Sequence, residues 1–213
     1  MGSTLTDILD AAAHGRFPSP DGGTTVVPQP SCRDAGVIAF TGHSVVFTDE
    51  DPQWVRRTLA SVDCDPLAAT MNPRFLGALL DHTRRSMDTI DLLTVASSLD
   101  GPPPLPLTEL ADAGHPRELR ARRRRDDIRV WAAEGGVVVL GRGVAGRWEA
   151  ATEVDDGCRH RGLGRALATA ARHLVPDGDP VWAQQAAGNA RSVRAFQAAG
   201  FRPVGAEALL LAT

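Results

Sequence analysis

The sequence predicts a mixed α/β protein built from two halves, and three observations support this. Segments with the two-residue period of strands alternate with segments that have the helical period of about 3.6 residues. Apolar residues make up 43% of the 213 residues and charged residues 23%, which is typical of a packed globular protein. The run Gly101-Pro102-Pro103-Pro104-Leu105-Pro106 suits neither a helix nor a central strand. We therefore expect domains at residues 1–100 and 108–213, joined by a linker at 101–107.

The first half is predicted to contain three helices and five strands. Asp49-Glu50-Asp51 places negative charge where a helix begins, which is favourable at a helix N-terminus. The predicted helices are Leu5–Ala13, Pro52–Ala60 and Pro73–His82, and the predicted strands are Thr24–Val27, Val37–Phe40, Ser44–Phe47, Leu67–Ala69 and Ile90–Ala96.

The second half shows clearer periods. Proline suits a first helical turn, and glycine suits the end of a helix, as at Gly200. Gly135-Gly136 predicts a tight turn between two strands. The predicted order is helix Pro116–Arg125, strands Ile128–Ala133, Val137–Gly141 and Trp148–Val154, a helix from Gly162 to Leu174, strand Val181–Gln184, helix Ala190–Ala199, and strands Phe201–Val204 and Ala208–Ala212.

Two local similarities suggest that the halves are a diverged repeat. An Asp-x-Asp-Pro sequence precedes Leu67 in the first half and Val181 in the second. The only asparagines, Asn72 and Asn189, each stand just before a predicted helix. In each similarity the two members are about half the chain length apart. A tandem repeat is one interpretation, and a coincidence caused by the biased composition is the other.

Composition excludes several classes of chemistry. The chain has no lysine, which excludes a phosphate-binding loop of the Gly-Lys-Ser/Thr type and a lysine Schiff base, and it has no tyrosine to act as a general acid. Three separated cysteines predict no disulfide framework. No apolar run reaches the roughly 18 residues of a membrane span, and no signal peptide is evident. We therefore expect a cytoplasmic protein with no membrane partner, and the net charge of −3 favours no nucleic-acid partner.

The segment from Glu153 to Arg165 carries the strongest functional pattern, because a strand leads through a short loop into a glycine-rich helix start. The first N–H groups of a helix have no partner within it and attract anions. Gly162 and Gly164 would let a phosphate approach the backbone, and Arg159, Arg161 and Arg165 supply positive charge. By itself this pattern also fits a glycine-rich turn without a ligand.

Together with Asn189, Phe196 and Gly200-Phe201, the motif resembles the GNAT superfamily of acetyl-CoA-dependent N-acetyltransferases over about residues 115–213. The two linked halves further resemble the glycine N-acyltransferase-like branch. The resemblance implies a GNAT fold, with two GNAT-like halves in tandem. It implies that the first half is degenerate and shapes the acceptor cleft, and that the second half binds acetyl-CoA. No metal is expected.

The family's loop pattern (Q/R)xxGx(G/A) falls on Arg159, Gly162 and Gly164. The resemblance implies that the loop holds the pyrophosphate and that the edge of the preceding strand pairs with the pantetheine arm. The implied cofactor-binding residues are Thr152, Val154, Arg159, His160, Arg161, Gly162, Leu163, Gly164, Arg165, Asn189 and Phe196.

The sequence departs from the family at two positions. Phe196 replaces the tyrosine that often protonates the leaving thiolate, and Gln184 replaces a carboxylate that often acts as the base. Glu149 and Glu153 are the candidate catalytic residues, since period-2 counting puts both on one face of Trp148–Val154. The alternative is that both are solvated carboxylates on the face of the strand, without a catalytic role. Glu134 and His115 are weaker candidates.

The expected reaction is transfer of an acetyl group from acetyl-CoA to a primary amine, on a small molecule or a peptide, by direct attack in a ternary complex. The loss of both usual acid–base positions favours a second hypothesis, a non-catalytic acyl-CoA-binding or regulatory module. Cys158 is interpreted as a loop residue, with a nucleophile as the alternative. The arginine-rich stretch 117–125 is a solvated helix face, a nucleic-acid site or a site for an anionic acceptor. The sequence predicts no particular oligomeric state, and a monomer and a homodimer are the two alternatives.

Overall fold

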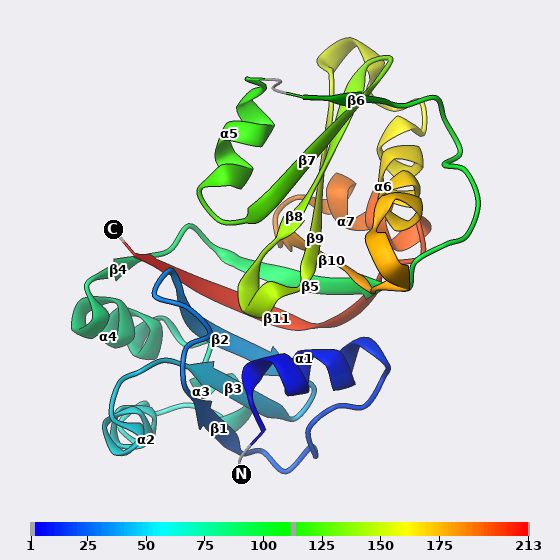
Figure 1. Ribbon diagram of the computed structural model, residues 1–213. Coiled ribbons are helices and arrows are strands. Elements are labelled where there is room, and N and C mark those ends of the chain that lie inside the picture. The colour runs from blue at the N-terminus through cyan, green and yellow to red at the C-terminus, as the bar shows by residue number, and fades with distance from the viewer. Residues whose placement is uncertain (1–2, 112–113, 213) are drawn as a thin grey trace. The chain divides into compact units, whose positions relative to one another are not determined.

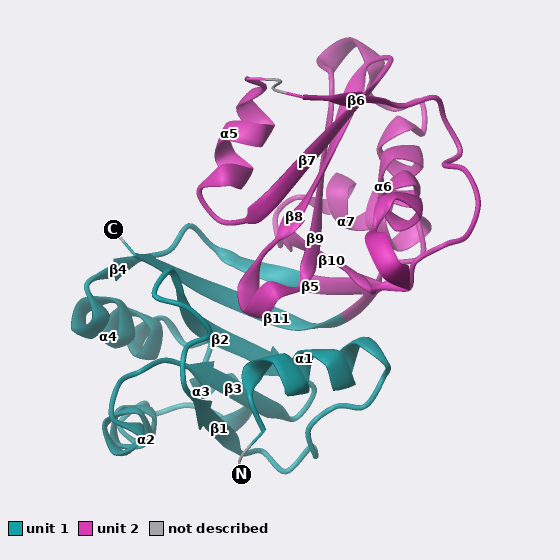
Figure 2. Cartoon of the chain, in the orientation of Figure 1, with its two compact units in different colours: residues 1–92, 204–213 teal, residues 93–203 magenta. Residues whose placement is uncertain are grey.

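The computed structural model describes residues 3–111 and 114–212, and these form two compact units (Figure 2). Unit 1 contains residues 1–92 and 204–213, and unit 2 contains residues 93–203. The division differs from the predicted boundary at the proline run, because strand β5 (Ile90–Ala96) crosses from one unit into the other and the C-terminal strand belongs mostly to unit 1. The linker at 101–107 therefore lies inside unit 2.

Unit 1 is a mixed sheet with helices (Figure 1). Its strand order is β1-β3-β2-β11, with β1 and β3 parallel and the other pairs antiparallel; β4 also pairs with β11. Its elements are α1 (Leu5–Ala13), β1 (Thr24–Val27), β2 (Asp34–Phe40), β3 (His43–Phe47), α2 (Pro52–Ala60), α3 (Pro66–Ala69), α4 (Pro73–Thr83), β4 (Arg85–Ser86) and β11 (Arg202–Ala212).

Two predictions for these elements are wrong for identifiable reasons. Leu67–Ala69 is not a strand but part of α3, because Pro66 fits a first helical turn and the Asp65 carboxylate accepts the Leu67 N–H at 2.9 Å. The two predicted C-terminal strands are one continuous strand, β11, which pairs with β2 from Ala206 to Leu211. The Asp-x-Asp-Pro similarity thus precedes a helix in one half and a strand in the other, so the tandem repeat stays a prediction.

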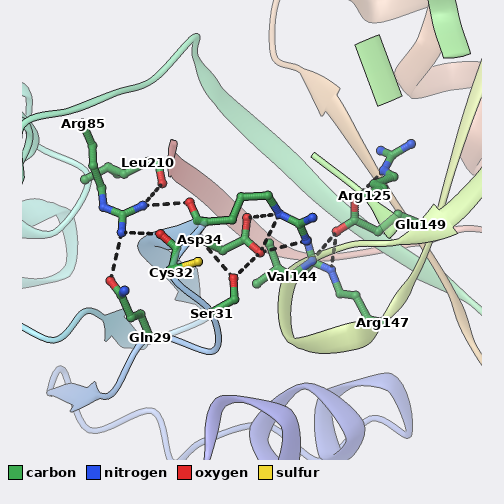
Figure 3. Close-up of polar contacts among 11 residues, drawn as sticks. Gln29, Ser31, Cys32, Asp34, Arg85, Arg125, Val144, Arg147, Glu149 and Leu210 are labelled. Carbon is green, nitrogen blue, oxygen red and sulfur yellow. Dashed lines mark hydrogen bonds and ion pairs between the residues drawn. The ribbon is translucent and has the colours of Figure 1, made fainter. Parts of the chain in front are cut away.

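Arg85 is at the centre of a group of hydrogen bonds in unit 1 (Figure 3). Its guanidinium donates to the carbonyls of Arg33 at 2.7 Å and Cys32 at 3.0 Å, to that of Leu210 at 3.3 Å, and to Gln29 Oε1 at 3.2 Å. One side chain therefore joins β4, the start of β2 and the end of β11.

We expect Arg85→Met to lower the free energy of unfolding by roughly 1–3 kcal/mol, because the carbonyl groups lose charged donors. Chemical denaturation followed by circular dichroism measures the change. Arg74→Met is the matched control, since Arg74 is exposed in the first turn of α4. Equal stabilities of the two variants would contradict the assignment.

Unit 2 also contains strands of a mixed sheet, with helices on both faces (Figure 1). Its strand order is β10-β9-β8-β7-β6, in which only the pair β10/β9 is parallel. Its elements are β6 (Thr108–Leu110), α5 (Pro116–Arg122), β7 (Asp126–Ala133), β8 (Gly136–Arg142), β9 (Trp148–Val154), α6 (Leu163–Leu174), β10 (Val181–Ala186) and α7 (Ala190–Ala198), with short 3₁₀ turns at Val144–Gly146, Asp156–Cys158 and Pro176–Gly178.

The two faces of this sheet pack against different helices. Val138 and Leu140 join Leu167 and Ala171 of α6 in the main core of the unit. Val139, which points to the opposite face, clusters with Val130 and Ala121 of α5. No helix among the described residues is both long and apolar enough to cross a membrane.

Candidate functional site

The N-terminus of α6 is open. Gly162 occupies the cap position with φ 84°, and no side chain caps the helix. Every other α-helix in the described residues has a side chain that accepts a hydrogen bond from its first turn. The first N–H groups of α6 are therefore left for a ligand or water, at the positive end of the helix dipole. His160, at φ 65°, is also left-handed, and such a curled backbone can gather N–H groups into an anion-binding concavity.

The two glycines of this loop have different surroundings. A Cβ added at Gly162 would meet nothing within 4 Å, so this position faces open space. A Cβ at Gly164 would lie 3.7 Å from side-chain atoms of Ala195 and Val154, which is ordinary van der Waals contact. Gly162 thus keeps space open for a ligand and supplies the left-handed turn, whereas Gly164 packs between α7 and β9.

The end of β9 has one unpaired edge. Strand β8 pairs with β9 along its whole length, from Trp148 to Val154. On the other side, the described pairing with β10 ends at Glu149. Asp155 N donates to Gly135 O at 2.9 Å, so by the alternation of antiparallel pairs the N–H and C=O groups of Thr152 and Val154 point away from β8. An extended ligand could therefore add to this edge like another strand.

These two features open into the same cleft, with a volume of about 860 Å³. Most of the predicted binding residues line it, together with the candidate base: Thr152, Glu153, Val154, Arg159, His160, Gly162, Leu163, Gly164, Arg165 and Asn189. Six of its described lining residues are arginines and only Glu153 is acidic, so the cleft is strongly basic although the whole chain has a net charge of −3.

The structure places three predicted site residues elsewhere. Arg161 does not line the cleft. The Phe196 ring is only 3% exposed and packs edge-on against Phe201 in the core, with centroids 4.9 Å apart. Glu149 lies deep in the unit. In place of Phe196, α7 presents Arg191, Ser192 and Ala195 to the cleft, and these residues lie on one face of the helix.

Glu149 is held in a buried ion-pair network (Figure 3). Its carboxylate is 2.8 Å from Arg125 Nε and 2.9 Å from Arg147 Nε, and it accepts the Val144 N–H at 3.3 Å. Burial raises the pKa of Glu149, but the charges of Arg147 and Arg125 and hydrogen bonds from Arg125 and Gln184 outweigh it and lower the pKa to about 2. These features suit a structural carboxylate and make Glu149 a poor proton acceptor.

Glu153 differs from Glu149 although both lie on β9. It pairs with Val137 in the register and Glu149 pairs with Gly141, so both side chains lie on the face of the sheet that α5 covers. Glu153, however, is exposed and lines the cleft. It is the carboxylate placed to reach a substrate bound at the end of β9.

The other residues that the sequence singled out cap helices, lie in a turn or pack against the backbone. Asn189 Oδ1 accepts the Ser192 N–H at 3.1 Å and so caps α7 at the border of the cleft. His115 Nδ1 accepts the Arg117 N–H at 3.1 Å and caps α5. Glu134 lies in the exposed turn between β7 and β8. Cys158 lines the cleft, and its Sγ packs over Gly135, where no Cβ would fit.

Four lining residues of α7 were not predicted as site residues, and they are Arg191, Ser192, Arg194 and Ala195. Arg117 and Arg120 of α5 also line the cleft. They belong to the arginine-rich stretch for which an anionic-acceptor site was one of three interpretations, but the charge pattern alone did not distinguish residues that face the cleft from those that face solvent.

Comparison with known proteins gives a similarity of fold. No protein-family profile matches the chain, and no curated protein matches its sequence. Solved structures that resemble it include a GCN5-related N-acetyltransferase from Sphaerobacter thermophilus (15% identity, TM-score 0.40) and one from Kribbella flavida (16%, 0.42). A tandem GNAT protein from the clavulanic acid biosynthesis pathway is also similar (11%, 0.39). Each match covers 64% of this chain, and the chain spans 55%, 63% and 57% of those three proteins, respectively.

Proposed function

We propose that this protein is an acetyl-CoA-dependent N-acetyltransferase that acts on a primary amine by direct transfer in a ternary complex. The observation that carries the proposal is the meeting of the uncapped α6 N-terminus and the unpaired edge of β9 in one basic cleft. A pyrophosphate suits the first, and an extended amide-containing arm suits the second. The resemblance of the Arg159–Gly164 motif to the GNAT loop supports the same assignment.

Different residues of the cleft would bind different parts of acetyl-CoA. The N–H groups at the start of α6 would hold the pyrophosphate, with Arg165 of that helix adding charge. Thr152 and Val154 would hold the pantetheine arm. The Val154 N–H, which points away from β8, is the proposed donor to the thioester carbonyl.

Bound acetyl-CoA supplies an acetyl thioester. The acceptor nitrogen attacks its carbonyl carbon, a C–N bond forms, the C–S bond breaks, and the thiolate leaves. Glu153 is the proposed base that takes the proton from the amine. With no tyrosine in the chain and Phe196 in the core, a solvent proton can serve the thiolate, whose ordinary pKa of about 8.5 makes it a tolerable leaving group.

Unit 1 has no equivalent open helix start after its third strand. In the turn from β3 to α2, the Asp51 carboxylate accepts the N–H groups of Gln53 at 2.9 Å and Trp54 at 3.2 Å. A carboxylate at this position both satisfies the donors and repels phosphate. We therefore propose that acetyl-CoA binds to unit 2 alone and retain, as part of the proposal, a degenerate GNAT-like first half that shapes the acceptor cleft.

A non-catalytic acyl-CoA-binding module is the second candidate. It is favoured because neither residue at the two common acid–base positions can transfer a proton in the cleft. Phe196 lies in the core, and Gln184 hydrogen-bonds Arg125 and Glu149. Calorimetry with acetyl-CoA and a thiol-release assay over a panel of amines separate the candidates. Binding with turnover supports the enzyme, binding without turnover on any amine supports the module, and no binding contradicts both.

We expect Gly162→Val to abolish measurable acetyl-CoA binding. The variant puts a β-branched side chain into the space at the helix start and must hold a left-handed φ, which costs roughly 1–2 kcal/mol. Calorimetry measures the affinity, and thermal unfolding shows whether the protein is folded. Gly164→Ala is the control, because its Cβ would make only ordinary contacts, and it should bind acetyl-CoA nearly as the wild type does. Normal binding by a folded Gly162→Val protein would contradict the loop assignment.

A further inference from the structure

Two arginines of α5, Arg117 and Arg120, line the cleft. Arg117 and Arg120 make no side-chain hydrogen bond or ion pair with any described residue, whereas Arg122 pairs with Glu118 and Arg125 with Glu149 in the same stretch. The Arg117 Nε is fully buried and unsatisfied within the described part of the chain. Charged donors that line a cleft and have no hydrogen-bond or ion-pair partner among the described residues are available to a ligand.

These arginines lie on the other side of β9 from the open helix start. Val154 packs with the core beneath α6, whereas Glu153, the next residue back along the strand, points to the face that α5 covers. Arg117 and Glu153 are close enough that the carboxylate acts on the pKa of the guanidinium. Arg117 therefore borders the proposed base, away from the α6 N–H groups that suit the pyrophosphate.

The charge of Arg117 is unfavourable at this position in the folded protein. Burial lowers the pKa of its guanidinium, the nearby charges of Arg125 and Arg120 lower it further, and Glu153 offsets part of this effect. Burying a cation and leaving one of its donors unsatisfied both cost free energy of folding. A bound anion in the cleft would supply the opposite charge to this guanidinium.

We propose that the acceptor amine carries an anionic group, a carboxylate or a phosphate, which Arg117 and Arg120 bind beside Glu153. This inference rests on the proposed acetyltransferase function and adds the class of its acceptor. The planar guanidinium of Arg117 can form two parallel hydrogen bonds to such an anion, while Arg120, one helical turn along and exposed, adds charge at the mouth. The amino group of the same molecule is then held near the Glu153 carboxylate.

The test uses the full chain and pairs of amines that differ in the anion. Amino acids are compared with their carboxamides, and phosphoethanolamine with ethanolamine, in the thiol-release assay with saturating acetyl-CoA. The variants are Arg117→Gln, Arg117→Lys and Arg120→Gln, with Arg123→Gln as the matched control because Arg123 is exposed at the end of α5 and does not line the cleft.

We expect the wild type to prefer the anionic member of a pair, and Arg117→Gln to lower this preference, the ratio of the kcat/KM values of the anionic and neutral members, roughly 10- to 100-fold. Arg117→Lys should retain part of the preference, since it keeps the charge but not the two-point geometry. Acetyl-CoA affinity should stay unchanged, and the melting temperature of Arg117→Gln should stay equal or rise, which separates a ligand-binding role from a structural one.

Other outcomes overturn the inference in different ways. Equal use of both members of every pair by the wild type, with turnover intact, removes the anionic acceptor but not the acetyltransferase. Loss of acetyl-CoA binding in Arg117→Gln assigns the guanidinium to a phosphate of the donor instead. Absence of turnover on the whole panel, although acetyl-CoA binds, removes the proposed function and the inference with it. A preference for phosphoethanolamine or for the amino acids identifies which anion the site takes.

Discussion

Glu149→Gln should be the most destabilising conservative substitution in unit 2, lowering the free energy of unfolding by about 3–5 kcal/mol. Glutamine keeps the shape of the side chain, so the loss comes from charge. The Arg147 side chain is 4% exposed and that of Arg125 11%, and both would keep buried positive charges without the carboxylate. Urea denaturation followed by circular dichroism gives the difference.

An exposed ion pair on the same sheet provides the control. Glu109 is 2.9 Å from Arg129 Nε, but both side chains are nearly half exposed. Solvent screens such a pair, and Glu109→Gln should cost no more than about 1 kcal/mol. If the two variants lost similar stability, the network around Glu149 would not be the buried charge cluster described above.

The pH dependence follows from the lowered pKa of Glu149. A carboxyl whose pKa falls from the ordinary 4.5 to about 2 on folding stabilises the folded state above 4.5, and this contribution is lost as the pH falls toward 2. The stability difference between wild type and Glu149→Gln should therefore stay constant from neutral pH down to about 4.5 and then shrink. A difference that had already vanished at pH 4.5 would contradict the ion-pair assignment.

Local sequence signals predicted most of the elements, because caps and periodicity act over a few residues. Leu5–Ala13 and Trp148–Val154 have the predicted bounds, since a capping box at Thr4 begins one and the apolar alternation spans the other. The predicted strand at Leu67–Ala69 was wrong because its apolar residues also fit a strand, whereas Asp65 and Pro66 were the stronger local signal for a helix start. The length of β11 depends on its pairing with β2, which no local pattern contains.

The candidate site was predictable where it is local and not where it depends on tertiary contacts. The glycine loop and the edge of β9 adjoin in sequence, so one motif indicated both. Period-2 counting correctly put Glu149 and Glu153 on one face, but it could not show that Arg125 and Arg147 enclose one of them and leave the other in the cleft. The same limit applies to Arg117, whose place beside Glu153 depends on how α5 packs on the sheet.

Glu153→Gln should lower kcat roughly 10²- to 10⁴-fold while leaving acetyl-CoA affinity unchanged, if Glu153 removes the proton from the acceptor amine. Glutamine has nearly the same shape but cannot accept that proton at neutral pH. Raising the pH should restore part of the rate, because a larger fraction of the amine is then already unprotonated. Steady-state thiol release across a pH series measures both effects.

Glu109→Gln is the matched control, since Glu109 is an exposed carboxylate of β6 and does not line the cleft. It should turn over acceptor as the wild type does. An unchanged kcat in Glu153→Gln would remove the proposed base, and proton loss would then have to pass directly to water. A fall in kcat that high pH does not relieve, accompanied by weaker acetyl-CoA binding, would instead assign Glu153 to holding the donor. The carboxylate therefore has a kinetic signature that neither a solvated strand residue nor a binding residue would share.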